Sequence, residues 1–298
     1  MKKIFAVFLS VVMLISSSSI SAFGANSETV KTNPLDTGKE ILYYLYWTVD
    51  EKLESDLQDL QKKLELSDEQ MSTLKELGLT EHQNNTNLTS AYSSNNRSSI
   101  QSFNTTIENT TIERNETINS ILNDKYSDFR NWIASWWEDE REYRMNIIKP
   151  MASVNYIQVW ATQYVPTTSG AAEVALPDKY VKWANLGWGG NYNNPPYVVN
   201  VQSSTHSSSL VGIRVDEVGP WNENDNYWDN TRRKFTDLKL GVPEAQVAYY
   251  EDYNNGKDEF GRTVLNPAGI DLSTKAAKDL GFGSYESGWV VVTYTDLP

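Results

Sequence analysis

The hydrophobic pattern of this chain changes its period near Pro150, and that change limits the folds that the chain can adopt. Before Pro150, apolar side chains recur every three or four residues, which is the spacing of one face of an α-helix. From Ser153 onward, short runs rich in Val, Ile, Tyr and Trp alternate with turn residues and predict β-strands. The sequence therefore predicts an α+β protein with a helical region, residues 26–150, followed by a small β-barrel domain, residues 151–298.

Residues 1–25 have the pattern of a secretory signal peptide. A positively charged start precedes an apolar run at 4–15, and small residues suited to cleavage lie at 22–25. No other run approaches the roughly 20 apolar residues that span a bilayer. We therefore expect a secreted protein, extracellular or associated with the cell wall, that has no membrane span after signal cleavage.

Three or four helices are predicted in the helical region. Leucines at 53, 57, 60 and 64 indicate an amphipathic helix, and Ser-Asp-Glu-Gln at 67–70 has the form of a capping box. That box opens a second, short helix that Gly78 is expected to end. Residues 83–102 are dense in Asn, Ser and Thr and are expected to form a loop or a weakly ordered connection. Apolar residues at helical spacing within 100–147 predict one long helix or two broken ones.

The segment 211–220 predicts a strand whose apolar face ends in a carboxylate. Strict alternation places Glu217 on one face with three apolar residues, Val211, Ile213 and Val215. Arg214 and Asp216 fall on the opposite face, and Gly219-Pro220 takes the backbone out of the sheet. Partial burial would keep some of Glu217 protonated, which a general acid requires. The alternative is that Glu217 caps the turn or pairs with an arginine.

The segment 266–281 predicts a short strand that leads into a helix. The strand passes through Ile270, Ser273 is the expected N-cap, and Gly281 is the expected stop. Alternation turns Asp271 away from the apolar side of this strand. Its carboxylate is therefore either a working group or an acceptor for the backbone N–H groups of the first helical turn.

Two motifs, Arg214-Val-Asp-Glu-Val-Gly-Pro-Trp221 and Gly269-Ile-Asp-Leu-Ser273 with its helix, occur in the order found in one known family. Together they resemble the double-psi β-barrel of the RlpA-like (rare-lipoprotein-A-like) family, over the C-terminal half of the chain. The resemblance implies action on cell-wall glycans, with the acidic residue two places before Gly-Pro as the acid. Glu217 stands where that family has Asp. The resemblance to the more distant expansins and to barrel-fold inverting cellulases implies that Asp271 is a second working carboxylate.

Other positions depart from the RlpA-like pattern. Ala171 follows Thr-Thr-Ser-Gly where that family has Glu, and Glu173 stands before Leu-Pro where it has His. Neither His82 nor His206 fits a metal or triad site, so no metal and no cofactor is predicted.

Aromatic residues after the Gly-Pro turn are the second functional signal. Trp221, Tyr227 and Trp228 lie on a predicted loop, where flat rings can stack on sugar faces. With Arg214 they form the predicted substrate-binding set, and the alternative is that the rings only fix their own loop. Asp216 is a third catalytic candidate, although an exposed ion pair with Arg214 would explain both residues.

The composition narrows the partners but does not select one function. A net charge of −13 disfavours nucleic acid, which needs a basic surface, and the lack of Cys excludes disulfides and a lipid-bearing cysteine. We expect a polysaccharide, peptidoglycan above all, cleaved in the manner of a lytic transglycosylase or loosened in the manner of an expansin. A non-catalytic module that binds wall polymer or protein, with the helical region as a self-associating coiled-coil stalk, is one alternative. An inverting β-glucan hydrolase is another.

Overall fold

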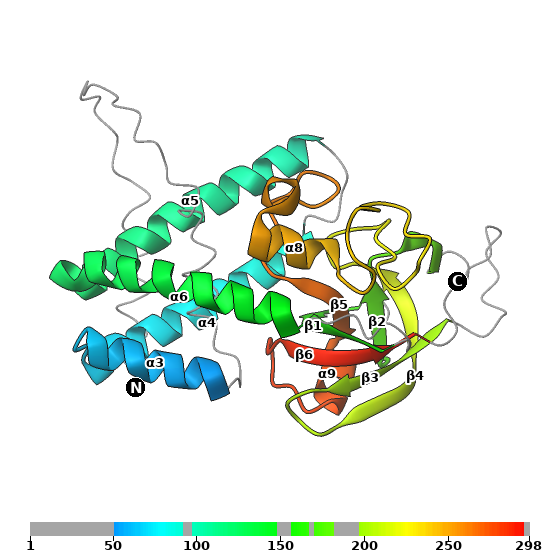
Figure 1. Cartoon of the computed structure of the whole chain (residues 1–298), viewed down its shortest axis with the longest axis horizontal. Coiled ribbons are helices and arrows are strands. Elements are labelled where there is room, and N and C mark those ends of the chain that lie inside the picture. The colour runs from blue at the N-terminus through cyan, green and yellow to red at the C-terminus, as the bar shows by residue number, and fades with distance from the viewer. Residues whose placement is uncertain (1–50, 92–96, 148–155, 167–169, 182–196, 295–298) are drawn as a thin grey trace. The chain divides into compact units, whose positions relative to one another are not determined.

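The computed structural model describes residues 51–91, 97–147, 156–166, 170–181 and 197–294 (Figure 1). The α+β class is confirmed, because helices come first and a closed six-stranded β-barrel follows. The predicted signal peptide, residues 1–25, lies outside the described residues. Among the described residues, no helix has the length and apolar character needed to cross a membrane.

Four α-helices precede the barrel in the described part of the chain, namely α3 (Glu51–Lys63), α4 (Asp68–Ala91), α5 (Arg97–Leu122) and α6 (Tyr126–Ile147). The capping box before α4 is confirmed. Ser67 N donates to Gln70 Oε1 at 3.0 Å, and Gln70 N donates to Ser67 Oγ at 3.1 Å. Between α5 and α6 a single 3₁₀ turn, Asn123–Lys125, begins with Asn123 at a φ of 51°. The alternative of two broken helices, rather than one long helix, is therefore confirmed.

Two predictions about the polar part of the helical region are wrong. The helix α4 continues through Gly78, although a glycine inside a helix costs about 1 kcal/mol relative to alanine. Residues 83–91 and 97–102 are also helical, where a loop was predicted. Tertiary contacts offset these weak helix propensities: buried Glu81 pairs with buried Arg114 on α5, with 3.6 Å between their charged atoms.

The barrel contains six strands, β1 (Tyr156–Tyr164), β2 (Glu173–Leu176), β3 (Val198–Ser203), β4 (Ser209–Val218), β5 (Ala268–Ser273) and β6 (Gly288–Thr293). Their order around the closed barrel is β1-β5-β2-β4-β3-β6. The pairs β1–β5 and β2–β4 are parallel, and the other four pairs are antiparallel. Exchanging β1, β2 and β3 with β4, β5 and β6 leaves this set of pairs unchanged, so the pairing has a pseudo-two-fold symmetry.

Two irregularities in β4 change the predicted alternation of its side chains. Val199 pairs with Ile213 and Val201 with Leu210, so the chain bulges at Val211-Gly212, where Gly212 has a φ of 66°. As a result Val211 is 83% exposed, and its predicted place on the apolar face is wrong. A second register shift, described below, sets the position of Glu217.

The strand-to-helix segment after β5 folds as predicted. The side chain of Ser273 accepts from Ala276 N at 3.2 Å and caps α9 (Thr274–Asp279). Gly281 follows with a φ of 89°, a conformation that favours glycine at a helix end. The sequence did not predict the short strand β2 or the helix α8 (Glu244–Glu251).

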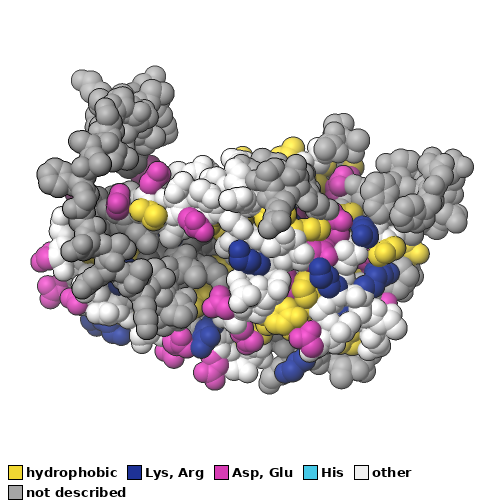
Figure 2. All heavy atoms as spheres, turned by 90° about the horizontal axis from the view of Figure 1, so that it is seen from above, with side chains coloured by type: hydrophobic (Ala, Val, Ile, Leu, Met, Phe, Trp, Pro, Cys, Tyr) yellow, Lys and Arg dark blue, Asp and Glu magenta, His cyan; other side chains and the backbone are white. Residues whose placement is uncertain are grey.

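The helices and the barrel share one apolar core on the α8 side. The helix α8 contacts both α6 and β5 (Figure 1). On α6, Trp137 stacks on Tyr250 with 5.8 Å between ring centroids and meets Tyr249 edge-on at 5.9 Å. Acidic and basic side chains are interspersed over the face of the molecule seen in Figure 2.

Candidate functional site

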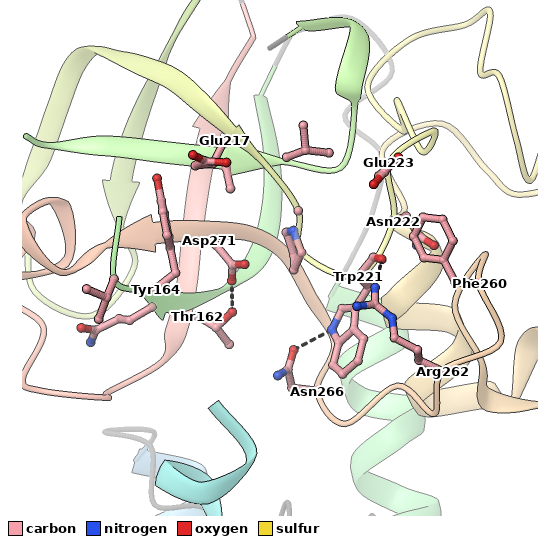
Figure 3. Close-up of a pocket in the computed structure, with 16 residues that line it drawn as sticks. Thr162, Tyr164, Glu217, Trp221, Asn222, Glu223, Phe260, Arg262, Asn266 and Asp271 are labelled. Carbon is pink, nitrogen blue, oxygen red and sulfur yellow. Dashed lines mark hydrogen bonds between the residues drawn. The ribbon is translucent and has the colours of Figure 1, made fainter. Parts of the chain in front are cut away.

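A pocket of about 290 Å³ lies between four strands of the barrel and the loops that follow β4 and α8 (Figure 3). Tyr164, Glu217 and Asp271 lie on one side of this pocket. Arg262 and the segment 221–223 lie on the other side. The two carboxylates that the sequence motifs predicted, Glu217 and Asp271, therefore line the same cavity.

Strand pairing explains why these two carboxylates meet. Thr162 on β1 pairs with Asp271 on β5, Asp271 pairs with Ala175 on β2, and Ala175 pairs with Glu217 on β4. Four residues thus form one row across the barrel wall. The register between β2 and β4 shifts after Val174, so that Asp216 is skipped and Glu217 stands opposite Ala175. Without this bulge, a different residue of β4 would complete the row.

Asp271 is partly buried and is held by its neighbour on β1. The hydroxyl of Thr162 donates a hydrogen bond to Asp271 Oδ1. Burial raises the pKa of Asp271 to about 6, while the hydrogen bond from Thr162 acts in the opposite direction. Because Ser273 caps α9, the alternative role of Asp271 as a helix cap is wrong.

A tyrosine and a glutamate that the sequence did not predict as site residues form a pair beside the carboxylates. The hydroxyl of Tyr164 donates to Glu173 Oε1 at 3.0 Å. Burial raises the pKa of Glu173, and the bond from Tyr164 opposes that shift. Burial, followed by the negative charges of Glu173, Glu217 and Asp271, raises the pKa of Tyr164, so its hydroxyl stays protonated. The sequence feature that could have indicated this pair is Glu173, which replaces the His that the RlpA-like resemblance led us to expect before Leu-Pro.

Trp221 is a structural wall of the pocket. Its side chain is only 4% exposed, and its indole Nε1 donates to Asn266 Oδ1 at 3.0 Å. The guanidinium of Arg262 donates to the carbonyl oxygen of Trp221 and pairs with Asp258 at 2.5 Å. The indole lines the pocket but is held by the protein on several sides. This agrees with the alternative that the aromatic rings fix their own loop.

The neighbouring loop residues are held by a buried polar network. Asn222 Nδ2 donates to Glu244 Oε2 at 2.8 Å, and Asn222 Oδ1 accepts from Glu259 N at 2.8 Å. The carboxylate of Glu259 in turn accepts from the backbone N–H groups of Glu223 and Asn224. The loop that forms this wall is therefore fixed through both its side chains and its backbone.

Four other predicted residues do not line the pocket. Arg214 and Asp216 form an ion pair at 2.7 Å, and the side chain of Arg214 is 43% exposed. Tyr227 is fully buried, with its hydroxyl donating to the carbonyl of Gly269 at 2.9 Å. Trp228 stacks on Tyr294 with 5.0 Å between ring centroids. The structure thus gives these four residues packing and pairing roles outside the cavity.

Neither histidine lies at the pocket. His82 Nε2 is 2.6 Å from the carbonyl oxygen of Tyr285, and His206 Nε2 is 3.1 Å from Glu286 Oε1. In the part of the chain that the structure describes, no group of three or more His, Cys, Asp or Glu side chains is arranged to hold a metal ion. The polar side chains that line the pocket include carboxylates, the hydroxyls of Thr162 and Tyr164, amides and the guanidinium of Arg262.

Comparison with known proteins gives a match to a family model that has no assigned activity. A family model described as a domain of unknown function (DUF8814) matches residues 155–293, which include all six strands of the barrel. The chain matches no curated protein and no solved structure. Any function for the pocket must therefore be argued from its own residues.

Proposed function

We propose that the C-terminal barrel is of the double-psi type and that, after export, it cleaves a cell-wall glycan, with peptidoglycan as the expected polymer. The observation that carries this proposal is the shared row of Glu217 and Asp271 in one pocket. The pseudo-two-fold pairing of the six strands supports the barrel type. Both carboxylates come from the two motifs that resemble the RlpA-like family.

In the cleavage of a glycosidic bond, one carboxylate would act as the general acid and the other as the general base. An acid must protonate the leaving oxygen, and a base must take a proton from the attacking hydroxyl. Asp271, with a pKa of about 6, is partly protonated in mildly acidic conditions and suits the acid. Glu217 is the base in this scheme. One proton leaves Asp271 and one reaches Glu217, and solvent restores both groups after the product departs.

The strand spacing bears on which hydroxyl attacks. Glu217 and Asp271 are separated by one intervening strand, so their Cα atoms lie two strand spacings apart, roughly 9.5 Å. In glycosidases the mechanism follows the distance between the carboxyl groups themselves, about 5–5.5 Å where one of them acts as nucleophile and about 6.5–9.5 Å where a water attacks. We propose attack by a water or by the sugar's own hydroxyl, without a covalent glycosyl intermediate.

Digestion of purified wall sacculi tests this function. We expect the wild type to release soluble fragments and Glu217→Gln and Asp271→Asn each to lower the rate by about 100-fold or more, the usual size of an acid–base contribution. Asp279→Asn, which removes a surface acid from α9, is the matched control and should keep the wild-type rate. Mass spectrometry of the fragments separates reducing ends from anhydro ends. Equal release by all four proteins, or none by the wild type, rejects the proposal.

Binding without cleavage is the second candidate, and the pair Tyr164–Glu173 is the observation that favours it. Glu173 of this pair stands where the resembled family has a histidine before Leu-Pro, so the barrel departs from that family beside its carboxylates. In this case the protein would be retained on wall material without releasing product, and Glu217→Gln would not alter retention.

A further inference from the structure

The hydrogen-bond donors around the pocket are largely used within the protein. The amide nitrogen of Gln163 donates to two carbonyls, those of Gly283 and Glu286, both at 2.7 Å. Other lining donors are also engaged by protein acceptors, namely Thr162 by Asp271, Tyr164 by Glu173, Trp221 by Asn266 and Asn222 by Glu244. A ligand in this pocket would therefore depend on the remaining donors, such as the amide of Asn266, which takes part in its own bonds through Oδ1.

Acceptors and negative charge, in contrast, face the same space. Three carboxylates line the pocket, those of Glu217, Glu223 and Asp271. Among the described lining residues Arg262 is the single cation, and its guanidinium already pairs with Asp258 and bonds the backbone of Trp221. The hydroxyl oxygen of Tyr164 adds another acceptor, because its hydrogen is directed to Glu173.

The excess of acceptors and negative charge over donors in the pocket favours some sugar substituents over others. A carboxylate on the ligand would be repelled by those of the three acids that are ionised. An acetamido group brings a carbonyl oxygen that needs a donor, and leaving such an acceptor buried without one costs about 1–3 kcal/mol. An ammonium group has three donors, no acceptor and a positive charge, so it matches the pocket in both respects.

We infer that the pocket takes a glycan bearing a free amino group, an N-deacetylated hexosamine, with its ammonium directed at Glu217, Glu223 and Asp271. This inference rests on the proposed function, since it names the substrate class of the same pocket. It also separates the roles of the acids. Glu223 lies on the loop side of the pocket and serves selectivity, whereas Glu217 and Asp271 lie on the barrel side and also serve bond cleavage (Figure 3).

Calorimetric titration with two matched tetrasaccharides tests the inference. One is the tetramer of N-acetylglucosamine and the other the tetramer of glucosamine, each titrated near the pKa of Asp271, about 6, at low and at physiological salt. We expect the glucosamine tetramer to bind at least about 10-fold more tightly. Glu223→Gln should lower that preference and change the affinity for the acetylated tetramer less than the affinity for the glucosamine tetramer.

The controls distinguish the pocket from the charge of the whole protein. With a net charge of −13 the chain attracts any cation, and Asp279→Asn removes one surface acid outside the pocket. If this variant and Glu223→Gln lose the preference equally, bulk attraction explains it and the inference is wrong. Equal or tighter binding of the acetylated tetramer also overturns the inference and leaves glycan cleavage standing. Binding of neither tetramer overturns it too, and the digestion of sacculi then decides separately whether the barrel acts on a glycan.

Discussion

Glu217 and Asp271 flank Ala175 in one row of the barrel wall, one on each neighbouring strand of β2. This relationship joins two motifs that lie far apart in the sequence, because β2 is inserted between β4 and β5. Ala175 lies between them in the row, and all three residues line one shared opening, the pocket. The proposed chemistry depends on that shared opening.

The rate of glycan cleavage should fall as the pH rises through about 6. Burial raises the pKa of Asp271 to about 6, so the carboxyl loses the proton that it must give to the leaving oxygen above that pH. Glu217 and Tyr164 face the same space, and Tyr164 stays protonated throughout this range. Initial rates of fragment release across the range give the profile. A rate that instead increases through pH 6 and then stays constant would assign Asp271 the role of base.

Tyr164→Phe should lower the free energy of unfolding by about 1–3 kcal/mol, because buried Glu173 loses its hydroxyl donor. Glu173→Gln keeps an acceptor for Tyr164 and removes the buried charge, so we expect Tyr164→Phe to cost less in that background. Urea denaturation of the two single variants and the double variant measures the coupling. Tyr126→Phe on α6 is the matched control. Additive effects within about 0.5 kcal/mol would show that the pair contributes no coupling.

The local sequence predicted those strands and helices that have a long residue pattern or clear residues at their ends. The strands β1, β3, β4 and β6 each contain several β-branched or aromatic residues, and Ser273 and Gly281 mark the ends of α9. The strand β2 was missed because it has only four residues, all buried, between a turn and Pro177. A run this short has no period to detect.

Tertiary contacts explain the features that the sequence patterns predicted wrongly or did not predict. A glycine at 78 and a polar stretch at 83–102 predicted an interruption, but α4 and α5 are held by buried pairs such as Glu81 with Arg114. The two carboxylates of the pocket, Glu217 and Asp271, were each predicted from a separate motif. Their meeting in one row, and the contact of Tyr164 with Glu173, depend on strand order and on the bulge at Asp216.

Asn104→Ala should loosen the pocket wall from outside the barrel. This α5 side chain donates to the carbonyl of Gly261 at 3.0 Å and accepts from Thr263 N and Oγ1 at 2.9 and 3.1 Å, on either side of Arg262. We expect a loss of about 1–3 kcal/mol in unfolding free energy and a weaker apparent affinity for glycan with kcat nearly unchanged. Asn109→Ala, at an exposed position on the same helix, is the control. If Asn104→Ala behaves like the control, the helical region is independent of the pocket.

Glu244→Gln should make the protein's stability less sensitive to pH. Glu244 is fully buried, and burial raises its pKa from 4.5 to about 8, although Asn222 donates to it at 2.8 Å. A carboxyl with a raised folded-state pKa contributes stability that is complete below 4.5 and is lost as the pH rises through about 8. Wild-type unfolding free energy should therefore fall by up to roughly 1.4 kcal/mol per pH unit within that window.

The variant keeps an acceptor for Asn222 and has no charge to bury, so its slope should be shallower and its stability higher than wild type at the alkaline end. Asp225, whose pKa burial raises to about 6, accounts for part of the slope that remains below that pH. Urea denaturation at several pH values within the window measures the slopes. Glu251→Gln, at an exposed position on the same helix, should leave the wild-type slope unchanged. Parallel curves for Glu244→Gln and wild type would mean that Glu244 keeps its charge, stabilised by the network around Asn222.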